Sequence, residues 1–306
     1  MLETACLIPM SSRNYVLITP AKDEAKFIGP LAESIVAQTV PPARWIVVSD
    51  GSTDGTDEIV QRYAQTHSFI QLVCIPSGQK RSFGSKALAF RRGCDALAGL
   101  EFTYIGNLDA DMTLEPNYYE RLMVAMENDS RLGIATGVCW DKTPTGFQQI
   151  TISLNHAVGA VQFFRRECFE EIGGYRPVSV GGMDSLAELT ARMKGWQTQA
   201  FQELPVYHHK PVDSGSGRNA RHICYRAGLT EYHIGTHPLF ALVKALRRWR
   251  QKPVGLCVLF RVAAYAKLWL SGVRRDAPDE LVAYVRTEQL GRLRGFWGRG
   301  KSEFGG

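Results

Sequence analysis

NYVLITPAKDE, residues 14–24, contains the pattern that decides the fold: a β-branched and aromatic run followed by a polar turn. The pattern recurs in WIVVSDGSTDGT at 45–56 and in FTYIGNLDADM at 102–112. Buried strands and helices are expected to alternate, with strands at 14–19, 45–49, 69–75 and 102–106 and helices at 25–38, 56–67 and 85–97. This alternation predicts an α/β domain with a doubly wound, mostly parallel sheet.

The turns after the strands carry the polar residues of greatest interest. In a doubly wound sheet, ligands bind at the carboxyl ends of the strands. TPAKDE at 19–24, DGSTDGT at 50–56 and NLDADM at 107–112 all fall there. Farther along, a helix at 117–128, a strand at 132–139 and an irregular region at 140–160 are expected to complete the same domain.

Composition and charge limit the classes of protein that fit. The 306 residues are 45% hydrophobic and 22% charged, which excludes disordered and fibrous proteins. The net charge of +6 is uneven, because residues 237–306 hold 14 Lys and Arg against 5 Asp and Glu, an excess of +9 that leaves −3 elsewhere. These basic residues show no helix-turn-helix, zinc or ribonucleoprotein motif, so no nucleic-acid partner is expected.

The cysteines and the N-terminus bear on the cellular compartment. The seven cysteines are scattered without a close-spaced pair, and we expect small buried apolar groups in a reducing compartment. The first dozen residues lack the basic start and long apolar run of a secretory signal. Residues 253–270 are the most apolar segment, but Arg261 and Lys267 within it argue against a membrane span. Cytoplasm is the expected location.

Two carboxylates, Asp109 and Asp111, flank Ala110 at the end of the fourth expected strand. There they can point at one hard cation, and Mg²⁺ or Mn²⁺ suits oxygen ligands of this kind. Phosphate oxygens and water would supply the remaining ligands. A solvated acidic pair or a helix cap is the alternative interpretation.

The turn at 50–56 leads from a strand into a helix through two glycines. Backbone amides in such a turn can approach a ligand closely, and Asp50 can accept a hydrogen bond from a base N–H. Asp54 stands just before the expected helix, so an ordinary helix cap is the alternative. Both interpretations can hold, with Asp50 functional and Asp54 partly structural.

Together, TPAKDE, VVSDGSTDGT and LDADM, in this order and spacing, resemble glycosyltransferase family 2, whose members have the GT-A fold. The resemblance covers roughly residues 15–209. It implies an inverting transfer of a sugar from a nucleotide-diphosphate donor. The resemblance also implies that the two carboxylates of the DxD motif, Asp109 and Asp111, bind the metal. The residues that it places at the donor are Pro20, Ala21, Glu24, Asp50, Ser52, Asp109, Ala110 and Asp111.

The sequence departs from the family pattern at residues 89–93. AFRRG stands where the family often has A-x-N-x-G, which puts in doubt the contacts made by the Asn. Lys86, just before this segment, is a candidate partner for the negative charge of the donor.

A second departure concerns the catalytic base, which the family usually supplies from a Glu-Asp pair ahead of a helix that ends in Gly-Trp. The matching stretch here is GGMDSLAEL at 181–189. The reaction needs a carboxylate that takes the proton from the acceptor hydroxyl. Asp184, directly after two glycines, is favoured over Glu188, which lies one turn farther on the same helix face. An N-cap of a helix at 185–194 is the alternative role for Asp184.

His208 ends the last strand of the resembling region, in VYHHKP at 206–211. A neutral imidazole can complete a Mg²⁺ or Mn²⁺ shell, and an ordinary surface or core histidine is the alternative. Lys210 and Arg218 flank a Gly/Ser-rich stretch at 214–217 and are expected to bind the donor diphosphate. A solvated basic loop is the other interpretation.

The acceptor side is less clearly marked. Trp140, Gln162 and Trp196 are candidates for the acceptor cleft, because aromatic faces stack on sugars, but aromatic residues can equally belong to the core, as we expect for Phe163 and Phe164. The expected acceptor is a polysaccharide or a lipid-linked glycan. Residues 239–249 and 253–270 mix apolar and basic residues, which suits helices on an anionic membrane surface. Packing on the catalytic domain with solvated charges is the alternative.

These expectations combine into one domain plan and one function. A leader at 1–13 precedes a GT-A domain at 14–235, with a nucleotide-binding half at 14–113 and an acceptor half at 114–235, and a basic helical extension at 236–306. The expected enzyme uses a nucleotide-diphosphate sugar, with UDP-sugar favoured, and Mg²⁺ or Mn²⁺, in the cytoplasm or at the inner face of the cell membrane. A catalytically inactive nucleotide-sugar-binding protein and a sugar nucleotidyltransferase remain as alternatives.

Overall fold

The computed structural model describes residues 13–76, 84–210, 220–250 and 254–302. Contacts between residues divide the chain into two compact units. The first unit contains residues 1–80, 86–174 and 195–211, and the second contains 81–85, 175–194 and 212–306. All the expected donor and metal residues except Arg218 belong to the first unit, whereas Asp184 and Glu188 belong to the second.

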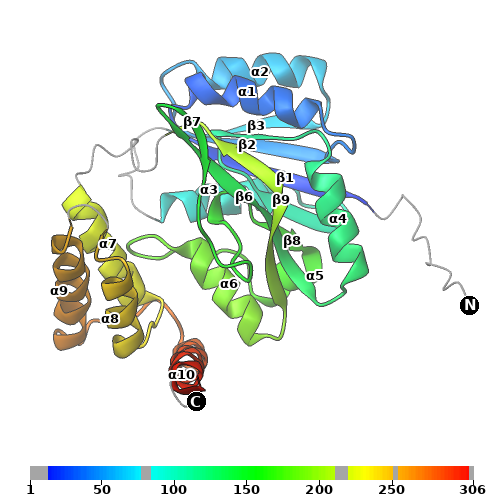
Figure 1. The fold of residues 1–306 in the computed structure, drawn as a ribbon. Coiled ribbons are helices and arrows are strands. Elements are labelled where there is room, and N and C mark those ends of the chain that lie inside the picture. Colours follow the sequence, from blue (N-terminus) through cyan, green and yellow to red (C-terminus); the bar gives the residue numbers. More distant parts are fainter. Residues whose placement is uncertain (1–12, 77–83, 211–219, 251–253, 303–306) are drawn as a thin grey trace, which may run out of the picture. The chain divides into compact units, whose positions relative to one another are not determined.

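Four parallel strands form one half of the sheet in the first unit (Figure 1), in the order β3-β2-β1-β4. The elements are β1 (Tyr15–Ala21), α1 (Ala25–Val36), β2 (Arg44–Asp50), α2 (Thr56–Thr66), β3 (Ile70–Ile75), α3 (Ser85–Asp95) and β4 (Tyr104–Asn107). β1 and β2 are buried along nearly their whole length, as continuous apolar runs require. The predicted alternation is confirmed, and each predicted bound lies within two residues of the observed one.

The sheet continues beyond β4 with strands of mixed direction, in the order β4-β8-β6-β9-β5, while β7 pairs with β6 as a hairpin. The elements are β5 (Met112–Leu114), α4 (Tyr118–Asn128), β6 (Leu132–Thr143), β7 (Gly146–Gln149), the 3₁₀ turn η2 (Gly159–Val161), β8 (Phe163–Arg165), α5 (Arg166–Glu171) and β9 (Gln197–His208). The expectation of an irregular region from residue 140 onward is therefore wrong for 140–149. β6 and β9 run parallel for about a dozen residues and carry their C-terminal residues to one edge.

Aromatic side chains fill the core between the sheet and its helices. The rings of Tyr15, Tyr119 and Phe163 pack against one another, with centroids 4.8 to 5.7 Å apart. Phe163 and Phe164 are fully buried, which confirms their expected place in the core. Where β6 passes β9, only glycine fits at Gly137, because a Cβ there would lie 2.1 Å from the carbonyl oxygen of Leu204.

The second unit is helical, as the C-terminal sequence predicts. Its elements are α6 (Met183–Met193), α7 (Ala220–His233), α8 (Pro238–Arg247), α9 (Leu256–Leu270) and α10 (Asp279–Ser302). A disulfide between Cys224 and Cys257 joins α7 to the first turn of α9. The expectation that the cysteines are simply small apolar groups is therefore wrong for this pair. None of the helices in the described ranges is both long and apolar enough to cross a membrane.

Candidate functional site

Asp109 lies directly after β4, and the backbone around it is fixed from two sides. The amide of Leu108 donates to the carbonyl of Ile18, and the amide of Asp109 donates to the carbonyl of Ala160, at 3.1 and 2.9 Å. The Asp109 carboxylate pairs with the ammonium of Lys86 at 2.5 Å. Burial raises the pKa of Asp109, Lys86 lowers it, and the nearby Asp111 raises it, so the pKa is held above its usual value.

Asp111 and His208 come together because β5 pairs with β9. Met112 is in register with His208, and Asp141 of β6 is in register with the same histidine from the other side. The Nε2 atom of His208 lies 3.4 Å from Asp111 Oδ2, and its Nδ1 atom lies 2.9 Å from Asp141 Oδ1. Burial alone would lower the pKa of His208, but these two carboxylates raise it to about 9. Burial would raise the pKa of Asp111, but His208 and Lys210 hold it below its ordinary value.

Glu24 and Lys210 complete the same cluster. The Lys210 ammonium donates to Glu24 Oε1 at 2.7 Å, although 186 residues separate them in sequence. Glu24 Oε2 is buried and has no hydrogen-bond partner in the part of the chain that the structure describes. Burial raises the pKa of Glu24, Lys210 lowers it, and Asp111 and Asp109 raise it further. The structure therefore gathers Glu24, Lys86, Asp109, Asp111, His208 and Lys210, which were all predicted from sequence.

The turns after β1 and β2 are tied together by hydrogen bonds. The ammonium of Lys22 donates to the carbonyls of Asp50 and Gly51 at 2.8 and 2.7 Å. Asp23, with a φ of 53°, accepts from the amide of Thr53 and donates its own amide to Ser52. The Ser52 hydroxyl therefore stabilises the loop by accepting the hydrogen bond from the Asp23 amide. The sequence analysis missed Lys22 and Asp23, although both stand inside the TPAKDE segment.

Asp54 and Asp50 have different roles in these turns. The Asp54 carboxylate accepts from the amides of Ala25 and Thr56, the first residues of α1 and α2, at 2.9 and 3.1 Å. It therefore caps two helices, and its pKa is lowered by these bonds and by the Thr56 hydroxyl, against the effect of burial. The Asp50 side chain is half-buried at the end of β2, and within the described ranges its carboxylate has no hydrogen bond. That carboxylate remains available to a ligand.

Three small residues of the donor motifs act through the backbone. Pro20 is partly exposed near the end of β1, while Ala21 and Ala110 are buried, at 3% and 4% exposure. Their side chains offer no polar group.

The oxygen and nitrogen atoms of this cluster suit a divalent cation as ligands. Two ligands in neighbouring positions of an octahedral ion, each about 2.1 Å from it, lie about 3 Å apart. Asp111 Oδ2 and His208 Nε2, at 3.4 Å, are close to that separation. In the described residues no three acidic, histidine or cysteine side chains already surround one point, so Asp109 would have to exchange Lys86 for the ion. Buried, unsatisfied oxygens of Glu24 and Asn107 mark further acceptors nearby.

The three predicted acceptor residues lie in different places. Trp140 directly precedes Asp141 in β6, and its indole N–H is buried without a partner within the described ranges. Gln162 is fully buried and donates to the carbonyl of Ala157, so it braces the loop that holds Asp109 and does not line an open cleft. Trp196 stands just before β9, twelve residue steps or roughly 40 Å from His208 along an extended strand. Its indole donates to Glu171 at 2.8 Å, away from the cluster around His208, and its place in an acceptor cleft stays a prediction.

The candidate bases stand on α6 of the second unit. The helix begins at Met183 after Gly181 and Gly182, both with positive φ, so Asp184 lies in the first turn and is not the N-cap. Asp184 is partly exposed, whereas Glu188 is 3% exposed and pairs with Arg192. Glu188 is thus a buried ion-pair partner and a poor candidate for a base. Arg218 lies outside the described residues.

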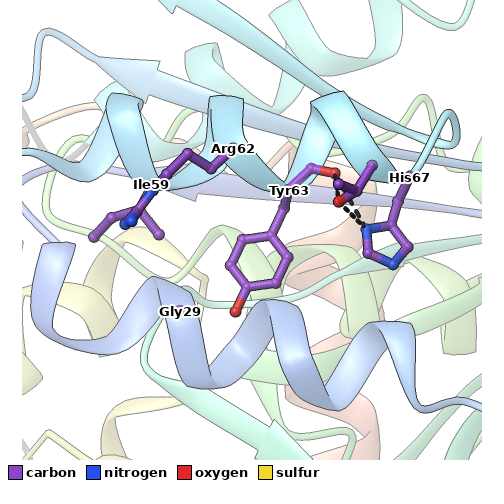
Figure 2. A pocket seen from close by; sticks show the side chains of 6 residues that line it. Gly29, Ile59, Arg62, Tyr63 and His67 are labelled. Atoms are coloured by element: carbon purple, nitrogen blue, oxygen red, sulfur yellow. Dashed lines mark hydrogen bonds between the residues drawn. The ribbon is translucent and has the colours of Figure 1, made fainter.

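A hollow elsewhere on the first unit is separate from these groups. Figure 2 shows it between α1 and α2, lined by Gly29, Ile59, Arg62, Tyr63, Thr66 and His67. The Nδ1 atom of His67 lies 2.9 Å from the Thr66 hydroxyl and 3.2 Å from the carbonyl of Tyr63, so local bonds occupy it. None of the predicted site residues lines this hollow.

Known proteins resemble both the sequence and the fold. The chain is 29% identical over 148 residues to the uncharacterized glycosyltransferase YibD of Escherichia coli K12, which is 44% of this chain and 40% of YibD. The structure of the Pyrobaculum calidifontis mannosyltransferase PcManGT, solved with GDP-Man and Mn²⁺, matches 85% of this chain and 76% of that chain, with a TM-score of 0.54 and 21% identity. Residues 1–349 of S. aureus TarS, solved with UDP-GlcNAc, match 84% and 73%, with a TM-score of 0.55 and 13% identity.

The two solved structures establish the fold as GT-A with additional C-terminal helices. The family profile described as glycosyl transferase family 2 matches residues 16–173, just over half of the 306 residues. That range contains every strand from β1 to β8 and both carboxylates of the DxD motif. The chain belongs to glycosyl transferase family 2.

Proposed function

We propose that this chain is a metal-dependent, inverting glycosyltransferase that uses a nucleotide-diphosphate sugar. The observation that carries the proposal is the cluster at the carboxyl ends of β4 and β9, where Asp111 and His208 lie at the separation of two metal ligands. Lys86 and Lys210 stand beside the carboxylates and can bind the phosphates. When bound, Mg²⁺ or Mn²⁺ would stabilise negative charge on the leaving diphosphate.

The residues of the first unit would also hold the nucleoside of the donor, through its base and its ribose. The Asp50 carboxylate can accept a hydrogen bond from the nucleobase of the donor. Lys22 fixes the loop that carries Asp50, through its bonds to the carbonyls of Asp50 and Gly51. Glu24 Oε2, buried and unsatisfied within the described ranges, can accept from a ribose hydroxyl. A uridine donor is favoured, in keeping with the UDP-GlcNAc complex of TarS, although PcManGT was solved with GDP-Man.

Asp184 is the proposed general base. An inverting transfer needs a carboxylate that takes the acceptor proton, and such groups contribute typically 10²- to 10⁴-fold to the rate. Asp184 follows two glycines and is partly exposed, while Glu188 is committed to Arg192. The proposed acceptor is a polysaccharide or a lipid-linked glycan, with Trp140 as a stacking surface next to Asp141.

Thermal-shift measurements with UDP, GDP and TDP, each with and without Mn²⁺, test the donor site. A ligand at one hundred times its Kd stabilises the fold by about 2.7 kcal/mol, which raises the Tm of a chain of this size by roughly 4 °C. UDP with Mn²⁺ should give the largest shift. Asp111→Asn should abolish the part that depends on Mn²⁺, while the matched change Asp95→Asn, at an exposed residue of α3, should leave it intact.

Turnover separates an enzyme from an inactive binding protein. Release of UDP from a UDP-sugar should fall at least 10²-fold in Asp184→Asn, with the thermal shift by UDP and Mn²⁺ unchanged. Asp279→Asn, in the first turn of α10, is the control within the same unit. Turnover in Asp184→Asn equal to that of the unmodified chain would show that Asp184 is not the general base. If no nucleotide diphosphate raised the Tm, the assignment as a glycosyltransferase would be contradicted.

A further inference from the structure

Helices α8 and α9 divide their side chains between interior and surface in an unusual way. Apart from Tyr265, the buried positions hold small residues or a paired charge: Ala241, Ala245, Cys257, Arg261 and Ala264. The exposed positions hold the large apolar residues: Leu239, Leu242, Leu246, Leu256, Leu259, Val262, Trp269 and Leu270. Soluble helices usually bury their leucines and expose their charges, so these helices have the opposite arrangement.

The exposed apolar residues form a stripe on each helix. In α8 the leucines at 239, 242 and 246 follow one another by three and four residues, which places them on one face. In α9 the exposed residues at 256, 259, 263 and 270 lie on one face, with the partly buried Ala266 between the last two. Apolar stripes that face solvent on a monomer mark a surface that binds a partner or a membrane.

The two stripes meet at the connection between the helices. The amide of Gly255 donates to the carbonyl of Trp249 at 3.0 Å, which brings the end of α8 next to the start of α9. Around this bond, Trp249 is 52% exposed, Val254 56% and Leu259 64%. The apolar surface is therefore continuous from one helix to the other at this end of the hairpin.

The charged residues in the sequence around this apolar surface are all positive. Residues 244–275 contain nine Lys and Arg and no Asp or Glu. The Arg250 guanidinium lies over the Trp249 ring, 5.3 Å from its centroid, and Lys267 is exposed beside the stripe of α9. Two of the nine are exceptions, because buried Arg261 and half-buried Lys244 both pair with Glu231 of α7. The remaining charge complements a layer of anionic phosphates.

We propose that the exposed face formed by α8, residues 248–250, residues 254–255 and α9 binds the surface of an anionic lipid bilayer. The leucines and Trp249 would enter the boundary of the acyl chains, while Arg250 and Lys267 would lie at the lipid phosphates. A second copy of this chain fits the face less well, because two such surfaces would bring like charges together without an acidic partner. The inference goes beyond the proposed function, since it uses no residue of the donor or metal site.

Vesicle sedimentation with the full chain tests the inference. The chain should sediment with vesicles of equal phosphatidylglycerol and phosphatidylcholine, more weakly at high salt, and hardly at all with phosphatidylcholine alone. Arg250→Gln with Lys267→Gln should weaken binding roughly 25-fold, at about fivefold for each charge. Trp249→Glu with Leu259→Glu should abolish it. Leu88→Glu, at a leucine of α3 that is 45% exposed, is the control that should bind normally.

Circular dichroism and the nucleotide thermal shift on the same preparations show whether each variant is folded. Both should be unchanged, so failure of membrane binding is distinguishable from failure of the donor site. Sedimentation of the Trp249→Glu, Leu259→Glu double variant at the level of the unmodified chain would overturn the inference. So would absence of vesicle binding together with a dimer, by light scattering, that this double variant dissociates.

Discussion

Protons and metal should compete for His208. Without a metal its pKa is about 9, because Asp111 and Asp141 lie on its two ring nitrogens. A metal ligand must be the neutral imidazole, so binding of Mn²⁺ has to release this proton. The affinity of the metal-free protein for Mn²⁺ should therefore change with pH.

The magnitude follows from the pKa. At pH 7.5 only about 3% of a group with a pKa of 9 is neutral, which weakens the apparent affinity roughly 30-fold, or by about 2 kcal/mol. Between pH 7 and 8 the affinity should rise about tenfold, and it should level off above pH 9. The Asp111 pKa is lowered below its ordinary value, so Asp111 adds no proton in this range.

Calorimetric titration with Mn²⁺ in buffers of different ionisation heat measures both the affinity and the number of protons released. About one proton should be released at pH 7.5 by the unmodified chain, and close to none by His208→Asn. His209→Asn is the matched control, because burial lowers the pKa of His209 and the ring is already neutral. An affinity that stays constant from pH 7 to 9 would refute the reasoning.

The same group makes the metal-free fold sensitive to alkali. The pKa of His208 in the folded chain, about 9, is above its ordinary value of 6.5, so its contribution to stability is complete below pH 6.5 and is lost as pH rises through 9. The metal-free Tm should accordingly fall between pH 7 and 9, and less so in His208→Asn.

Three further substitutions test other parts of the structure. Lys22→Met, which removes two hydrogen bonds between the turns after β1 and β2, should weaken UDP binding roughly tenfold in a thermal-shift titration without lowering the Tm by more than a few degrees. Gly137→Ala should cost at least 3 kcal/mol of unfolding free energy in urea, because its Cβ meets backbone at 2.1 Å. Arg261→Met should cost about 1.5 to 3 kcal/mol, because buried Glu231 loses its bond to Arg261 and keeps only the ion pair with Lys244, and adding Glu231→Leu should restore most of it.

The parallel half of the fold could be predicted from sequence because its strands are buried on both faces. Continuous apolar runs such as 15–18 and 45–48 are unambiguous when polar turns bound them. The hairpin of β6 and β7 lacked such a signal, since Gly146–Gln149 is exposed throughout. The disulfide between Cys224 and Cys257 depends on the packing of α7 against α9 across 33 residues, which no spacing rule reveals.

The site residues also divide into those that follow a predicted strand and those whose position depends on strand pairing. Asp109, Asp111 and Glu24 could be found because each follows a predicted strand, where parallel topology gathers side chains. Asp141 was missed because its role depends on β6 and β9 pairing in one register, which places it opposite His208. Trp196 shows the converse limit: its residue type suits sugar stacking, but the sequence does not reveal that it stands just before the start of β9, at the opposite end of the strand from His208. Residue type alone does not determine position along a strand.

The balance of charge in the cluster explains why metal and nucleotide should bind together. Seven ionisable side chains compose it: Glu24, Asp109, Asp111, Asp141, Lys86, Lys210 and His208. With His208 protonated, four acids against three cations leave a formal charge of −1, which repels a diphosphate. A divalent cation that displaces the His208 proton changes this to zero and frees Lys86 from Asp109 to meet the phosphates. UDP should therefore bind weakly without Mn²⁺, and by thermodynamic reciprocity UDP should raise the affinity for Mn²⁺ by the same factor.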